Sequence, residues 1–139
     1  MSVAANKFNC FVGDVGLKVH NLNIDTLKIM LTDVAPVAGN SVKTDLTEIS
    51  GTSNGYSAQS VANAYSQSGG IGTLTGTSPT FTQSGANAIG PFRYAVLYND
   101  SAASKNLICW WDLGGEVTLA AASGAMFTPT IGASLATIT

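Results

Sequence analysis

Charged residues are scarce in this sequence. Only 10% of the 139 residues are Asp, Glu, Lys or Arg, whereas an ordinary soluble protein carries about 25%. A bundle of amphipathic helices needs charged residues on its outer faces, so this composition disfavours a helical bundle. Disorder is also disfavoured, because 45% of the residues are hydrophobic and disordered chains combine low hydrophobicity with high net charge.

Basic clusters, long apolar runs and a basic leader are missing as well. The six Lys and Arg residues are dispersed and the formal net charge is −2, so we expect no nucleic-acid partner. No run approaches the ~18 apolar residues of a membrane-spanning helix, so we expect no membrane partner. The opening residues, MSVAANKFNCFVGDVG, contain no basic region followed by an unbroken apolar stretch. We therefore expect synthesis in the cytoplasm without a secretory signal.

Residue types that carry catalysis or bind metals are few. His20 is the only histidine, and the two cysteines, Cys10 and Cys109, show no ligand spacing. A zinc site needs three or four ligands, a Ser-His-Asp arrangement would have to use His20, and GGIGTLTG lacks the spacing of a phosphate loop. We expect that the protein is not an enzyme, with no catalytic residue, no metal site and no cofactor. Both cysteines are expected to be free, buried, small hydrophobic residues.

Short apolar segments alternate with stretches rich in Gly, Ser and Thr. Residues 26–33 (TLKIMLTD) predict a strand with Leu27, Ile29 and Leu31 on a buried face and the intervening residues on a solvent-exposed face. Residues 90–100 (GPFRYAVLYND) are apolar on both faces, which is typical of a central strand. Turn signals recur about every ten residues and predict an all-β, antiparallel, jelly-roll-like β-sandwich of about eight strands.

One short N-terminal helix is expected between Phe8 and Leu22. Gly13 and Gly16 weaken it by up to about 1 kcal/mol each. The length suits one domain, which we divide into an N-terminal arm and helix over residues 1–25 and a sandwich over residues 26–139. The expected apolar stripe of the helix consists of Phe11, Val15, Val19 and Leu22.

The stretch CWWDLGG, residues 109–115, holds both tryptophans and one of the cysteines. We interpret LICWWDL as a strand that pairs with the preceding one and ends in a Gly-Gly turn, with Asp112 and Glu116 as rim or turn charges. The segments EVTLA, AMFTPTI and SLATIT are expected to form three further short strands. Strict alternation places Leu107, Cys109, Trp111 and Leu113 on one face and Ile108, Trp110 and Asp112 on the other.

The two adjacent tryptophans must therefore face opposite ways, so that at most one fills the core. The other is expected to be covered by a loop of its own chain or by a partner, and alternation does not decide which indole is which. A second possibility is an aromatic platform for a sugar or base. That platform would consist of Tyr94, Tyr98, Trp110 and Trp111.

Several segments resemble a known family when they are taken in order. They are KFNCFVGDVGLKVHNL, DTLKIMLTDVAPVAGNSVKTDLTEIS, NGYSA and GPFRYAVLYND, followed by LICWWDLGGEVTL. Together they are similar to small structural proteins of tailed bacteriophages, described as capsid decoration or cement proteins. The resemblance is most specific at KFNCFV, KVHNL and GPFRYAVLYND and weakest over residues 63–82.

The resemblance implies a small β-sandwich, made in the host cytoplasm, that sits on the outer capsid surface of the virion. Its partners would be the major capsid protein, whose subunits it bridges, and itself, as a homodimer at two-fold positions or as a trimer. No catalytic, cofactor or metal residue belongs to the family pattern. The segment Met1 to Phe11 and the Gly/Ser-rich loops are expected to make lattice contacts. The alternatives are another virion component, such as a tail or fibre protein, and a carbohydrate-binding β-sandwich module.

Overall fold

The computed structural model describes residues 4–132 and 134–139. Over these residues the chain is an all-β, antiparallel, sandwich-like fold with ten strands, one α-helix, α1 (Cys10–Gly16), and one short 3-10 helix, η1 (Lys43–Asp45). The predicted fold class is confirmed. More strands are present than the eight or so expected, because four of the ten have only two residues each.

The largest sheet has five strands in the order β1–β8–β7–β2–β3, all antiparallel to their neighbours. Its centre consists of the two longest strands, so the segment GPFRYAVLYND is the central strand that its two-sided apolar pattern predicts. The bounds are β1 (Asn6–Lys7), β2 (Leu27–Thr32), β3 (Gln59–Ser60), β7 (Ile89–Asn99) and β8 (Leu107–Leu119).

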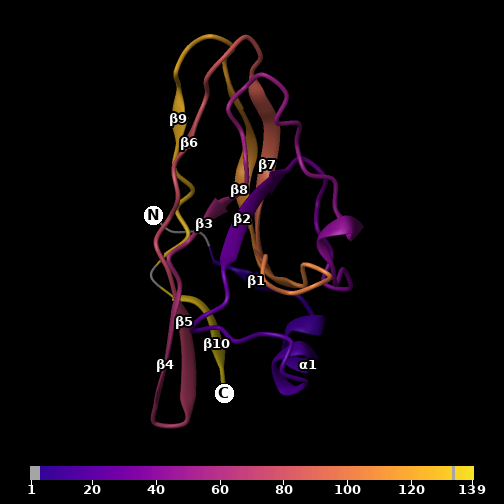
Figure 1. Cartoon of the computed structure of the whole chain (residues 1–139), viewed down its shortest axis with the longest axis vertical. Helices are drawn as coiled ribbons and strands as arrows, with labels where there is room; N and C mark the ends of the chain where they lie inside the picture. Colours follow the sequence, from indigo (N-terminus) through magenta and orange to yellow (C-terminus); the bar gives the residue numbers. More distant parts are fainter. Residues whose placement is uncertain (1–3, 133) are drawn as a thin grey trace.

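Two smaller sheets lie along one side of the five-stranded sheet (Figure 1). One has the order β10–β5–β4, and its β4–β5 hairpin projects past the rest of the sandwich. The other pairs β6 with β9 towards the opposite end of the molecule. The bounds are β4 (Ala64–Ser68), β5 (Ile71–Thr75), β6 (Phe81–Thr82), β9 (Met126–Phe127) and β10 (Ser134–Ile138).

The main core fills the space between the five-stranded sheet and the two smaller sheets. Leu27, Ile29 and Leu31 of β2 are fully buried in it, as their alternation predicts. The smaller sheets contribute one buried side chain from each of β5, β6 and β10. These three are Leu74, Phe81 and Leu135.

A second core covers the opposite face of the five-stranded sheet. Phe8, Met30, Val96, Tyr98 and Leu107 are buried together there, under the N-terminal segment and residues from the 46–58 region. The prediction that this face of β2 is solvent-exposed is wrong on that account. Alternation identifies the two faces of a strand, but it does not reveal which loops will cover the second face.

The helix is much shorter than the predicted Phe8–Leu22. It ends after Gly16 because Lys18 adopts a left-handed conformation, with φ at 64°. The Lys18 N–H then bonds to the carbonyl of Val15, and the Val19 N–H bonds to the carbonyl of Asp14. This is the hydrogen-bond pattern of a Schellman motif, which ends a helix and satisfies its last carbonyls. Phe11 and Leu22 of the predicted stripe are still buried in the main core, but only Phe11 lies on the helix.

The Gly-Gly pair does not form the predicted turn. Strand β8 runs unbroken from Leu107 to Leu119, and the segment EVTLA belongs to it instead of forming a separate strand. Between Tyr94–Asp112 and Phe92–Val117 the register shifts, because β8 carries more residues than β7 there. The pair therefore lies in a bulge, which adds residues to one strand without ending it.

A second register shift alters the predicted faces of β8. Between Leu97–Cys109 and Tyr98–Leu107 one residue of β8 is unmatched. As a result, Leu107 packs in the second core and Ile108 in the main core, the reverse of the strict alternation. Such a one-residue slip moves the residues beyond it to the other face.

Candidate functional site

The most polar buried site surrounds His20, four residues after α1. The imidazole side chain is fully buried. Its Nδ1 lies 3.0 Å from the Asn99 side-chain nitrogen, and its Nε2 lies 3.9 Å from the Asp14 carboxylate. The histidine thus joins the segment after the helix to the end of strand β7.

Asn99 is the centre of this hydrogen-bond network. Its amide nitrogen donates to His20 and, at 2.7 Å, to Asp25. Its amide oxygen accepts the backbone N–H groups of Ser101 and Ala102, which begin the loop after β7. Asn99 is completely buried, and both donor hydrogens and both acceptor lone pairs of its side-chain amide are used in these four hydrogen bonds. This residue organises the junction, although in the sequence it is only the penultimate residue of the predicted strand GPFRYAVLYND.

The hydrogen-bond pattern determines the protonation of His20. Because Nδ1 accepts a hydrogen bond from Asn99, the proton of the neutral ring is assigned to Nε2. Burial lowers the pKa of His20, and the carboxylates of Asp14 and Asp25 oppose this shift only in part. Within the described residues, Nε2 has no hydrogen-bond partner, and the Asp14 carboxylate at 3.9 Å is too far away to accept its proton. This arrangement suits a neutral structural histidine better than a general base.

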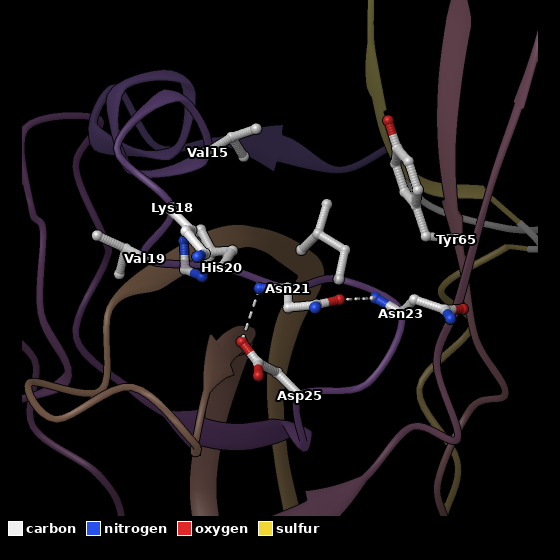
Figure 2. A pocket seen from close by; sticks show the side chains of 9 residues that line it. Val15, Lys18, Val19, His20, Asn21, Asn23, Asp25 and Tyr65 are labelled. Carbon is white, nitrogen blue, oxygen red and sulfur yellow. Dashed lines mark hydrogen bonds between the residues drawn. The ribbon is translucent and has the colours of Figure 1, made fainter.

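A surface pocket of about 350 Å³ lies beside this junction. Figure 2 shows His20 and Asp25 on one side and Tyr65 of β4 across from them. The floor is tied together by the Asn21 N–H, which donates to the Asp25 carboxylate at 2.8 Å. The pocket lies between the segment after α1 and the β4–β5 hairpin, and it is open at the protein surface.

The two tryptophans occupy different environments. Trp111 is completely buried in the main core, whereas Trp110 lies on the opposite face, half-buried, with its ring centroid 4.5 Å from that of Phe8. Its cover is therefore a segment of its own chain. Tyr98 is buried on one face of the five-stranded sheet and Trp111 on the other. These two residues therefore cannot share the predicted aromatic platform.

Both cysteines are free, as predicted. Cys109 is buried in the main core, and burial raises the pKa of its thiol far above the usual range. Cys10 is half-buried, and burial together with the nearby Asp14 raises its pKa to about 11. Thiols with such high pKa values are poor nucleophiles at neutral pH, because the thiolate is the reactive form.

Asp112 stabilises the bulge in β8. Its carboxylate accepts a bidentate pair of hydrogen bonds from Arg93, at 2.9 and 3.2 Å, and one from the Gly114 N–H at 2.8 Å. The hydrogen bond from Arg93 and that from Gly114 hold the pKa of Asp112 below its usual value. Asp112 is thus bound to backbone, as expected for a turn group, and its carboxylate is occupied by structural contacts.

No family model, curated protein or solved structure matches this chain.

Metal ligands do not gather into a group of three or more anywhere in the described part of the chain. Over the same residues, no helix has the length and apolar character needed to cross a membrane.

Several large aliphatic side chains are exposed on α1 and in the segment that follows it. Leu17 and Ile24 are 78% and 75% exposed, and Val12 on the outer side of the helix is also exposed. Val15 lines the pocket beside His20 and also a second pocket between α1 and the C-terminal residues 137–139. We call the surface formed by Val12, Val15, Leu17 and Ile24 the α1 surface. Of these four residues, only Val15 belongs to the predicted apolar stripe of the helix, so the helical pattern did not indicate this surface.

Proposed function

We propose that the protein is a structural virion protein that binds the outer surface of an assembled bacteriophage capsid. It stabilises the shell by bridging subunits of the major capsid protein. The resemblance of KFNCFV, KVHNL and GPFRYAVLYND to capsid decoration proteins supports this proposal. The chemistry of the site agrees with it, since the single histidine is buried and hydrogen-bonded into a structural junction.

The observation that carries the proposal is the exposed α1 surface. Leu17 and Ile24 are aliphatic and at least 75% exposed. Binding of a partner that covers them is favourable, because it removes apolar surface from water. Each copy then adds a modest contact, and many copies on one lattice add up to a large stabilisation. Binding to the assembled shell, and not to the dissociated subunit, shifts the equilibrium towards the shell by mass action.

The direct test is binding of the purified protein to expanded capsids that lack it. We expect the protein to co-sediment with these capsids and to raise their melting temperature. The variant Leu17→Glu should weaken binding by about tenfold or more, because it places a charge in the contact. Met126→Glu is the matched control, since Met126 is 69% exposed on β9 at the other end of the molecule.

Three results would contradict the proposal in different ways. Absence of binding to every capsid form would exclude a capsid decoration role. Gold label on the tail of intact virions would instead assign the protein to the tail or fibre. Equal loss of binding in Leu17→Glu and Met126→Glu would show that the α1 surface is not the contact.

A further inference from the structure

Strand β4 forms an open edge of the three-stranded sheet. The order β10–β5–β4 places it at the end, and four of its five residues are exposed. Its pairing with β5 is regular along the whole length, without a register shift. Figure 1 shows that the hairpin extends away from the body of the sandwich, which leaves the outer side of β4 accessible.

The backbone groups on this edge can be assigned from the turn. Gly69 and Gly70 have φ values of 59° and 82°, as a two-residue type I′ hairpin turn requires. Ser68 and Ile71 next to the turn are then a hydrogen-bonded pair, and the pairs alternate along the ladder. Tyr65 and Gln67 therefore direct their backbone N–H and C=O groups away from β5, towards the open edge.

The edge carries none of the usual protection against pairing with another strand. Natural edge strands are commonly interrupted by Lys, Pro or a bulge. The segment NAYSQSGGIG, residues 63–72, contains no charged residue and no proline. The other five-residue edge strand of the described chain, β10, has a register shift between Ser134 and Ala136. Strand β4 is thus the long, regular edge of this molecule.

We propose that β4 pairs antiparallel with β4 of a second copy of this chain, across a two-fold axis at Ser66. This register is self-complementary. It places Tyr65 opposite Gln67 of the partner subunit, and the outward backbone groups of the two residues then form two reciprocal hydrogen bonds. The symmetric pair forms two more, and the two three-stranded sheets become one continuous sheet of six.

The side chains fit this register. Ser66 lies opposite its own symmetry mate in a pair without backbone hydrogen bonds, where the Cα atoms approach to about 4.5 Å. Ala64, Ser66 and Ser68 share that face and are small and exposed, so they allow a close approach. Tyr65 points to the other face, where it lines the pocket beside His20 and packs on the main core.

The size of the interface between the two β4 strands, which we call the seam, predicts how tightly the dimer is held. Two five-residue strands bury less surface than the ~1,200–2,000 Å² of a stable protein interface. The dimer is therefore weak in dilute solution and becomes populated where copies are held close together, as on a lattice. The inference rests on the proposed function only in assigning the lattice as that place.

Charge variants at Ser66 test the seam. We expect the wild-type protein to show a reversible monomer–dimer equilibrium in sedimentation velocity up to ~1 mM. Ser66→Lys and Ser66→Glu should each raise the dissociation constant by about tenfold or more, because like charges then face each other across the axis. Mixing the two variants should restore dimers, since opposite charges now meet. Ser60→Lys, at an exposed serine on the edge strand β3, is the control that leaves the equilibrium unchanged.

A cysteine variant tests the register. Ser66→Cys should form a disulfide-linked dimer of twice the 14.2 kDa chain mass on non-reducing gels, because the Cα separation at the axis suits a disulfide. The wild-type protein should not cross-link, since its own cysteines lie away from this edge. A wild-type protein that stays monomeric at ~1 mM, a trimer, or a Ser66→Cys variant without covalent dimer would each overturn the inference.

The capsid assay separates this inference from the proposed function. Dimers that cross-link through Ser66→Cys but never bind a capsid would reject the function and retain the seam. Wild-type monomers that bind capsids normally would reject the seam and retain the function. If Ser66→Lys lost capsid binding without any wild-type dimer in solution, a strand of the capsid protein would be the occupant of the edge, and pairing with a second copy would be rejected.

Discussion

At the scale of the residue, the hydrogen bond between the buried side chains of His20 and Asn99 attaches the segment after α1 to the end of β7. The segments that carry His20 and Asn99, KVHNL and GPFRYAVLYND, are two of those on which the family resemblance is most specific. In the structure they meet through a single 3.0 Å hydrogen bond. His20 stood out in the sequence as the only histidine, whereas nothing in the sequence marked Asn99, because a buried amide and an exposed amide have the same letter.

This pair predicts a pH dependence of stability. Burial lowers the pKa of His20 below the ordinary value of 6.5, so the unfolded chain takes up a proton at a higher pH than the folded chain does. The free energy of unfolding should therefore fall as the pH decreases through about 6.5 towards the lower pKa of the folded state. Urea unfolding between pH 7.5 and 5.0 measures this slope. In His20→Gln, which keeps an acceptor for Asn99, the slope should be flatter, and an equal slope in both proteins would contradict the assignment.

At the scale of the element, local patterns predicted the strands that alternate and missed the places where register changes. Strand β2 was found because its apolar residues repeat with the period of a strand, and β7 was found because its segment is apolar on both faces. The bulge at Gly114 and the unmatched Ile108 were not predictable, since they depend on what pairs with β8. The helix was predicted too long for a related reason, because a stripe at helical spacing does not reveal a left-handed residue such as Lys18.

The bulge in β8 makes a matched pair of glycine variants informative. Gly114 has a φ of 89°, whereas Gly115 does not adopt a left-handed φ, and a Cβ atom at either position meets open space. Gly114→Ala should lower the free energy of unfolding by about 1–2 kcal/mol through backbone strain alone. Gly115→Ala should change it by less than about 0.5 kcal/mol. Chemical denaturation of the two variants provides the measurement, and similar values would show that the conformation of the bulge is not a constraint.

At the scale of the whole molecule, the five-stranded sheet is buried on both faces. Composition and turn spacing were sufficient to predict an all-β sandwich, because a charge-poor chain with short alternating segments has few other ways to fold. The second core was not predicted, since its cover comes from Phe8 and the 46–58 region, which lie far from β7 and β8 in the sequence. The resemblance to capsid decoration proteins remains the sequence observation that bears most on function.

The N-terminal segment should therefore contribute to the stability of the entire domain. Phe8 is fully buried and contacts Trp110, so Phe8→Ala should cost about 3–5 kcal/mol by leaving a cavity in the second core. The emission of Trp110 should shift to longer wavelength as water reaches its indole. Asn6→Ala, at an exposed position of β1, is the control and should change stability little. If Phe8→Ala left the free energy of unfolding nearly unchanged, the packing of Phe8 in the second core would not stabilise the domain.

The pairing of β1 with β8 has a consequence for folding during synthesis on the ribosome. Asn6 lies opposite Trp110 and Lys7 opposite Cys109, so the first strand can pair only after a segment more than 100 residues further along the chain has been translated. At ~5–20 residues per second, this wait lasts several seconds, during which Phe8 has no core to enter. Closure of the sheet thus depends on contacts between segments that are distant in the sequence, and such contacts form slowly. In a stalled chain that lacks β8, chaperones should bind and proteases should cleave the N-terminal segment first.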